Sequence, residues 1–204
     1  MAVHRLDRGL GHRQWAPGGD RPLAKSPYGV VTDAMVEAPT GHRTLYAPTP
    51  QLARFLTAAY RFHDVQVATC NARHSGRCWR VQAGPLQLSF TIGRRTLLGW
   101  LLWVMPARLA RTLWWVGLLD LAARRLLPGV RTCGRTRDGH RQWYGAQDVY
   151  PIIAASAALD GVDLGAPRAV HPPVGFGFGS VPSQPSLVHL TTMIEAAPPP
   201  LGCR

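Results

Sequence analysis

Strict alternation of apolar and polar positions marks three short segments in the first half of the chain. Residues 65–71 and 77–83 alternate on either side of the turn sequence NARHSG, and every second residue from Leu86 to Ile92 is apolar. A period of two places successive side chains on opposite faces of a strand, so each segment has one apolar face. The pattern therefore predicts a three-stranded antiparallel meander.

A helical period appears in two other stretches. Residues 50–60 follow the helix-start signal Thr49–Pro50 and share one apolar stripe made of Leu52, Phe55, Leu56, Ala59 and Tyr60. This stripe is typical of a short amphipathic helix. Residues 97–127 are apolar nearly all round, are interrupted by Pro106 and are followed by Pro128 and Gly129. Because proline breaks or bends a helix, the stretch predicts a pair of helices bent at Pro106.

Two further strands complete the pattern. Residues 131–150 read as a second hairpin that turns at Asp138–Gly139, and its second strand continues through Tyr150 and Pro151. Residues 186–196 alternate again as a closing strand. We therefore expect an α+β fold: an antiparallel sheet of about five or six strands, with the apolar helix pair and the short amphipathic helix packed on one face.

The ends of the chain are rich in proline, glycine and arginine and lack a helical or strand period. Residues 1–42 contain no apolar core of a secretory signal and read as a disordered leader, or as sequence upstream of a true start at Met35. Residues 197–204 read as a disordered proline-rich tail. Residues 43–196 are then a single α+β domain, which we expect to be cytoplasmic.

The apolar stretch 96–127 raises the question of a membrane. Its longest uncharged run, Thr96 to Ala107, has twelve residues, and the next, Thr112 to Leu119, has eight. A spanning helix needs about 20 predominantly apolar residues. Arg108 and Arg111 would lie near the centre of such a span, where each arginine costs about 2.5–3.5 kcal/mol. A simple membrane span is therefore disfavoured.

The second helix of this stretch still needs cover on more than one side, because a sheet can bury only one of its faces. Three kinds of cover remain open. The first is the preceding helix, folded back on it. The second is the surface of an anionic membrane, which the aromatic side chains Trp100, Trp103, Trp114 and Trp115 would enter. Arginines would then face the lipid headgroups: Arg94, Arg95, Arg108, Arg111, Arg124 and Arg125. The third is an apolar ligand held between helices and sheet.

The charge of the chain favours anionic partners. The formal net charge is +12, and 22 arginines stand beside one lysine and two glutamates. An arginine-for-lysine excess is what a GC-rich bacterial genome encodes, but codon usage does not account for the scarcity of glutamate. The arginines are spread over the chain without a run of four or a known binding module, so we do not expect nucleic acid as a partner.

Polar residues that could carry chemistry concentrate in the 131–150 hairpin. Arg135, Arg137 and Arg141 make the hairpin tip basic. In an extended strand Tyr144, Asp148 and Tyr150 have the same parity and would project to one face. These six residues are the candidate ligand-binding set, for a polar headgroup or a small anionic substrate. No nucleophile, base and orienting group can be assigned together, so no catalytic residue is named.

Neither a metal nor a cofactor is expected. Cys70, His74 and Cys78 resemble a ligand set, but their spacing does not give a zinc knuckle, and pairing the strands about His74 would set Cys70 opposite Cys78 as a packing pair. The glycines in residues 175–179 lie between prolines, so no helix N-terminus follows them to bind phosphate.

Three functions follow from these observations. The first expectation is a domain that binds an apolar or amphipathic small molecule between helices and sheet. The first alternative is a peripheral, or even integral, membrane protein anchored by residues 96–127. The second is an enzyme that acts on a small anionic substrate through the 131–150 hairpin. The oligomeric state does not follow from the sequence.

Overall fold

The fold is taken from a computed structural model, which describes residues 2–4, 31–106, 108–109, 112–126, 130–136, 139–170, 176 and 183–194. Three helices are present among them: α1 (Pro50–Ala59), α2 (Leu97–Val104) and α3 (Leu113–Leu126). The strands, in chain order, are β1 (Ala2–His4), β2 (Ala34–Glu37), β3 (Arg43–Ala47), β4 (Asp64–Val67), β5 (Cys70–Ser75), β6 (Cys78–Ala83), β7 (Leu86–Ile92), β8 (Cys133–Arg135), β9 (Arg141–Leu159), β10 (Val162–Asp163) and β11 (Ser186–Ile194).

The larger sheet contains seven strands and confirms the predicted antiparallel meander. Strands β5, β6 and β7 pair in sequence, and β7 pairs with β9, which also pairs with β8, β10 and β11. Alternate side chains are buried along β6, where Trp79, Val81 and Ala83 pack while their neighbours are exposed. The second hairpin and the closing strand are also present, so the α+β prediction is confirmed.

The register of the first hairpin differs from the prediction. The chain turns at Gly76, whose φ of 55° suits glycine, rather than at His74. Cys70 therefore lies opposite Ala83, and Cys78 lies opposite Ser75. The predicted cross-strand cysteine pair was wrong because the turn lies later in the chain, so that the partner of Cys70 is five residues beyond Cys78.

A second, smaller sheet was not expected from the sequence. It has the order β1-β2-β3-β4, with β3 and β4 parallel and the other pairs antiparallel. Its strand β2 lies within residues 1–42, which the sequence analysis assigned to a leader, yet Ala34, Met35 and Val36 are buried. Ordered structure thus begins before residue 43.

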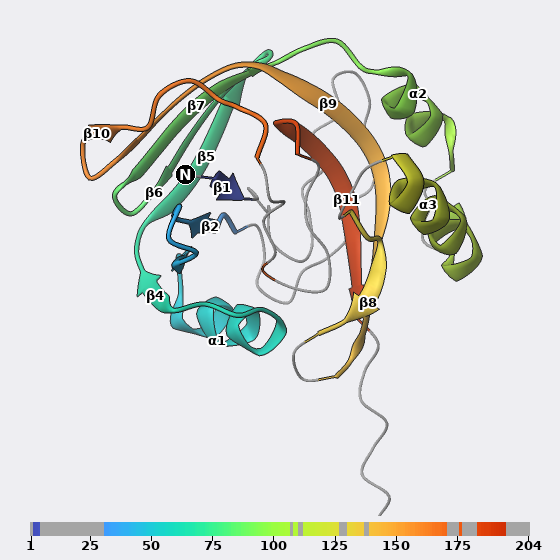
Figure 1. Cartoon of the computed structure of the whole chain (residues 1–204), viewed down its shortest axis with the longest axis horizontal. Helices are drawn as coiled ribbons and strands as arrows, with labels where there is room; N and C mark the ends of the chain where they lie inside the picture. Colours follow the sequence, from blue (N-terminus) through green and yellow to red (C-terminus); the bar gives the residue numbers. More distant parts are fainter. Residues whose placement is uncertain are drawn as a thin grey trace, which may run out of the picture.

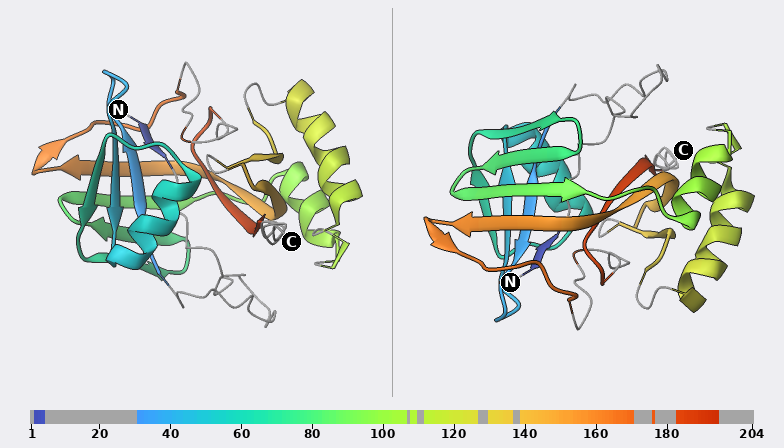
Figure 2. Two further views of the ribbon diagram at one scale, coloured as in Figure 1. Left: turned by 90° about the horizontal axis from the view of Figure 1, so that it is seen from below. Right: turned by 90° about the horizontal axis from the view of Figure 1, so that it is seen from above.

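Two core clusters hold the smaller sheet in place. The first packs α1 against β2 and β3 through the side chains of Met35, Leu45, Leu52 and Leu56. The second joins the two sheets. It consists of Ala34, Val36, Tyr46, Ala83 and Leu86. A third cluster, around Trp79 and Phe90, lies within the larger sheet. Figure 2 places α1 with the smaller sheet at one end of the molecule and α2 with α3 at the other.

The long strand β9 connects the two halves of the larger sheet. In Figure 1 it curves around the interior, and α2 and α3 lie on its outer side. Pro151 accepts a hydrogen bond from Gly93 N–H at 2.8 Å on the β7 side, whereas Ile152 N–H donates to Pro185 on the opposite side. Strands β8 and β11 both pair with Trp143, and one residue can pair with two strands only across its two edges, so β8 and β11 lie on opposite sides of β9. Strands β7 and β8 therefore share one edge of β9.

Between these two strands the shared edge has a gap. The pairing with β7 ends at Pro151, and β8 begins where Tyr144 N–H donates to Thr132 at 2.7 Å. Helix α2 closes this gap, since Gly99 lies against the carbonyl oxygen of Val149. The site described below lies at this junction of α2 and β9.

The predicted helix pair is present with different bounds. Helix α2 ends at Val104, just before Pro106, and α3 begins only at Leu113, because residues 108–109 form a turn. In the part of the chain that the structure describes, neither helix has the length and apolar character required to cross a bilayer.

Candidate functional site

Arg95 reaches β9 because the chain that follows β7 stays hydrogen-bonded to β9. Gly93 remains paired with Pro151, and a Cβ atom at Gly93 would lie 2.9 Å from a methyl group of Ile153. Three residues later, Thr96 caps α2 by accepting a hydrogen bond from Gly99 N–H at 3.1 Å. The two arginines between strand and helix, Arg94 and Arg95, are thereby held beside β9.

Arg95 makes a bidentate ion pair with Asp148. Its Nε donates to Oδ1 at 3.0 Å and its Nη2 donates to Oδ2 at 2.8 Å. The same Nη2 donates to the hydroxyl of Tyr150 at 2.7 Å, and that hydroxyl donates to Asp148 Oδ2 at 3.0 Å. The side chains of Arg95 and Asp148 are only 12% and 7% exposed. Partial burial and forked geometry make this a strong pair.

The Asp148 carboxylate is saturated by these contacts. Oδ1 also accepts a hydrogen bond from the Val149 N–H at 2.9 Å, so each oxygen has two donors. Burial, followed by the negative charge of Asp148, raises the pKa of Tyr150 above its ordinary value. A saturated carboxylate and a protonated phenol do not supply a general base at neutral pH.

The guanidinium of Arg95 is also enclosed by aromatic rings. Its Cζ lies 4.7 Å from the ring centre of Trp100 and 4.9 Å from that of Trp103, with Tyr150 at 5.3 Å. Cation–π contacts of this kind are worth about 0.5–2 kcal/mol each. They fix the two tryptophans of α2 relative to β9.

Helix α2 approaches β9 closely because residue 99 is glycine. A Cβ atom there would lie 2.5 Å from the Val149 carbonyl oxygen and 2.6 Å from Cγ of Arg95. Real Cβ contacts are longer, so a larger side chain would push the helix off the strand. Gly99 therefore allows the ion pair and the helix to occupy the same short gap.

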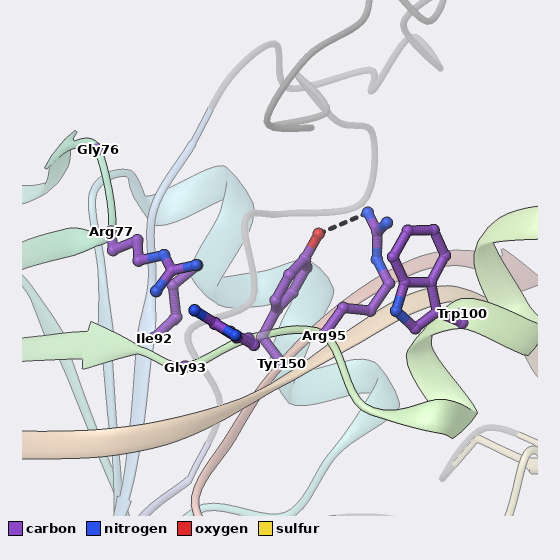
Figure 3. Close-up of a pocket in the computed structure, with 8 residues that line it drawn as sticks. Gly76, Arg77, Ile92, Gly93, Arg95, Trp100 and Tyr150 are labelled. Carbon is purple, nitrogen blue, oxygen red and sulfur yellow. Dashed lines mark hydrogen bonds between the residues drawn. The ribbon is translucent and has the colours of Figure 1, made fainter.

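A pocket of about 460 Å³ opens beside the ion pair. Figure 3 shows Arg77 extending from the β5–β6 turn toward the pocket, with Tyr150 at its centre and Arg95 beside Trp100 on the opposite side. Three arginines line it, Arg77, Arg94 and Arg95, and only Arg95 has an acidic partner among the described residues. The pocket is therefore positively charged and has an aromatic wall.

Helices α2 and α3 expose a large apolar surface, hereafter the apolar face. Its exposed members are Leu97, Leu98, Trp100, Leu101, Trp103, Val104, Leu109, Trp114, Leu118 and Leu121. Leu97 is 90% exposed, Val104 69% and Trp114 61%. Large exposed apolar surfaces are uncommon on monomeric proteins and often mark contact sites.

Three of the four tryptophans predicted to face a membrane belong to this face. Trp100, Trp103 and Trp114 are exposed, whereas Trp115 is buried beside Val116 on the inner side of α3. Adjacent residues of a helix point about 100° apart, and here the side chain of Trp114 faces outward while that of Trp115 faces inward. Trp115 is therefore removed from the membrane-facing set.

The five described members of the expected binding set lie in three places. Asp148 and Tyr150 join Arg95, but the hydroxyl of Tyr144 lies 2.9 Å from that of Tyr60, the C-cap residue of α1. The pairing of β9 with β11 is irregular between Ala146 and Asp148, which leaves one extra residue in β9 and interrupts the alternation on which the prediction rested.

Arg135 and Arg141 of the second hairpin lie away from that junction. Arg135 donates to the Gly139 carbonyl oxygen at 2.9 Å and so holds the turn, and it lies opposite the exposed Arg141. Arg137 lies outside the described residues. The cations of the pocket are instead Arg77 and the adjacent pair Arg94 and Arg95, a doublet between a strand and a helix that the sequence does display.

No group of His, Cys, Asp and Glu suited to a metal ion occurs among the residues that the structure describes. His74 stacks on Trp79 with ring centres 4.8 Å apart. Burial, followed by the charge of Asp33, raises the pKa of the Cys70 thiol to about 11, so this cysteine is protonated at neutral pH. The glycine-rich segment 175–179 falls outside the described residues except for Phe176.

The basic pocket thus shares Arg95 with the ion pair and Trp100 with the apolar face. Comparison with protein-family models, with curated proteins and with solved structures finds no match to this chain.

Proposed function

We propose that the protein binds peripherally to an anionic membrane through the apolar face of α2 and α3. The observation that carries this proposal is the exposure of leucine and tryptophan side chains on both helices, in a chain with a net charge of +12. Burying such side chains in the interface is favourable, at about 1.5–3 kcal/mol for each one fully buried. Tryptophan in particular prefers the membrane interface.

Charge favours a membrane over a neutral partner surface. Arg94 and Arg108 flank α2 and are exposed, so both can meet anionic headgroups when α2 enters the interface. Each arginine near an anionic membrane surface contributes about 1 kcal/mol of attraction. With the cytoplasmic location expected from the sequence, the membrane would be one whose cytoplasmic leaflet is negatively charged.

The two other functions expected from the sequence receive less support. The contact between α2 and β9 is filled by Arg95 and Asp148, and the space beside it among the described residues is the basic pocket rather than an apolar cavity. For catalysis, Asp148 is saturated and Arg135 holds a turn. We therefore do not propose an enzyme of the 131–150 hairpin.

The test is the double variant Trp114→Ala, Leu118→Ala. Both side chains are more than half exposed and lie one turn apart on α3, so the free energy of unfolding should change by less than about 1 kcal/mol. Co-sedimentation with vesicles of phosphatidylcholine and phosphatidylserine should weaken by at least about tenfold. Val162→Ala, at an exposed position of β10, is the matched control and should leave binding unchanged.

Two results would count against the proposal. Full-length protein that does not sediment with anionic vesicles has no membrane affinity to explain. A double variant that unfolds several kcal/mol more easily would show that these side chains are covered by protein, because removing large side chains from a core typically costs about 2–5 kcal/mol each.

A further inference from the structure

The pocket beside α2 has the charge to hold a phosphate group. Arg77 and Arg94 have no acidic partner in the described part of the chain, and Arg95 donates to Asp148 and Tyr150 through Nε and Nη2. After Asp148 neutralises Arg95, two positive charges remain in the lining. Guanidinium groups donate paired hydrogen bonds to phosphate oxygens, so two free arginines match a doubly charged phosphate.

The pocket adjoins the surface that we propose enters the membrane. Trp100 both lines the pocket and belongs to the apolar face, where it is 50% exposed. If the exposed side of α2 lies at the boundary between headgroups and acyl chains, the pocket opening lies at the level of the headgroups. Its volume of about 460 Å³ is large enough for a headgroup.

We infer that this pocket binds the headgroup of an anionic lipid that carries a phosphate monoester. The arginine side chains of the pocket bind the phosphate, and Trp100 and Tyr150 form its aromatic wall. A phosphate monoester carries about 1.5–2 negative charges at neutral pH and three free oxygens, which is more than a phosphodiester offers. This inference rests on the proposed membrane function and adds selectivity to it.

The test compares vesicles of equal surface potential. One set contains phosphatidic acid, a phosphate monoester, and the other contains phosphatidylserine, a phosphodiester. Full-length protein should bind the first set at least about fivefold more tightly. Arg77→Gln should lower affinity for phosphatidic acid by more than about tenfold, because a charged hydrogen-bonding partner is lost. The same variant should lower affinity for phosphatidylserine by only about fivefold, the effect of one surface charge.

Arg108→Gln is the matched control. Arg108 is exposed beyond the end of α2 and does not line the pocket. This variant should lower affinity for both kinds of vesicle by the same factor, about fivefold, and keep the preference for phosphatidic acid. Arg77 lies in an exposed turn, and its side chain makes no hydrogen bond to the described residues. Its backbone carbonyl accepts a hydrogen bond from Ile92 N–H at 3.1 Å, which the substitution keeps, so the unfolding midpoint should stay unchanged.

The outcomes separate the two proposals. If the protein binds both kinds of vesicle equally, or if the Arg77 and Arg108 variants behave alike, the headgroup site is wrong while the membrane function stands. If the protein binds neither kind, the membrane function itself fails. A third arm titrates soluble glycerol 3-phosphate without vesicles. Binding as tight as that to phosphatidic acid would show that the pocket serves a soluble phosphate compound, and would overturn the lipid assignment.

Discussion

Asp148 illustrates how one side chain can satisfy several needs at a break in a sheet. Beside the gap between β7 and β8, its carboxylate accepts the Val149 N–H that no strand on this edge accepts. It also compensates the charge of Arg95 and holds the hydroxyl of Tyr150. The pair is therefore a structural element that positions α2, and only its cationic partner faces the pocket.

Replacing Asp148 by asparagine should destabilise the fold strongly. The substitution leaves the charge of Arg95 uncompensated in a mostly buried place, for which the expected loss is about 3–5 kcal/mol. Urea denaturation measures this loss. The control is Asp163→Asn, at an exposed aspartate whose Oδ1 accepts a hydrogen bond from Gly165 N–H. Asparagine can accept the same hydrogen bond, so this variant should keep the stability of the parent. Equal losses in both variants would show that the ion pair contributes no special stability.

Tyr150 should make the protein less stable in alkali. Burial and the charge of Asp148 raise the pKa of this tyrosine in the folded state. Above the unfolded pKa, about 10, the unfolded chain loses this proton while the folded chain keeps it, so the free energy of unfolding falls as pH rises until the folded pKa is passed. Below that window the contribution is fully present.

Urea denaturation between neutral pH and this alkaline window tests the effect with Tyr150→Phe, which should show a shallower decline than the unmodified chain. Burial also raises the pKa of Tyr46, with added contributions from Asp160 and Asp64, so part of the decline should remain in the variant. An unchanged slope would contradict a role for Tyr150.

At the scale of elements, α2 replaces a strand. Where β7 leaves β9 at Pro151 and before β8 joins at Tyr144, a short helix covers the exposed edge. Thr96 is the N-cap of α2, and the helix ends after eight residues at the C-cap Met105, which Pro106 follows. Such a helix has little intrinsic stability, so its attachment depends on Arg95, Asp148 and the close approach at Gly99.

Two glycine-to-alanine substitutions give opposite expectations. Gly99→Ala places a Cβ 2.5 Å from the Val149 carbonyl oxygen, so the helix must shift, at a cost of about 1–3 kcal/mol. Gly117→Ala, in the middle of α3, meets nothing within 4 Å and should stabilise the protein by about 0.5–1 kcal/mol, because alanine is the better helix former. Thermal unfolding compares them. Equal shifts in the two variants would mean that α2 does not depend on contact with β9.

At the scale of the whole molecule, the sequence predicts local elements better than their partners. The two-residue alternation of residues 77–83 and 86–92 found β6 and β7 because each strand has one buried face. It did not give the register of Cys70, because alternation does not fix where the chain turns. The turn lies at Gly76 rather than at His74. The smaller sheet was missed because β2 has only four residues within a stretch rich in glycine and proline.

The candidate site was predictable only in part, for a related reason. Asp148 and Tyr150 were recognised as neighbours because they lie two residues apart on one strand. Their cation, Arg95, lies 53 residues earlier in the chain, and nothing in the pattern of either segment indicates such a pairing. The exposure of α2 and α3 likewise depends on which surfaces the sheets cover, which no single segment determines.

Met35 tests whether β2 belongs to the folded domain. This side chain is 1% exposed between β2, β3 and α1, so Met35→Ala should lower the free energy of unfolding by about 2–5 kcal/mol. Val67→Ala, at a position of β4 that is 54% exposed, should change it by less than about 0.5 kcal/mol. Chemical denaturation distinguishes them. A Met35 variant as stable as the parent would show that β2 does not contribute to the stability of the folded domain.

The pairing of β9 with β11 has a consequence for synthesis on the ribosome. Strand β9 can pair with β7 as soon as it is made, but its other edge receives β11 only after a further stretch of chain has been translated. During that interval residues 142–151 present an unpaired strand edge, and such edges readily recruit other chains. Non-local pairing of this kind also slows folding. The nascent protein should therefore depend on chaperones until β11 has emerged.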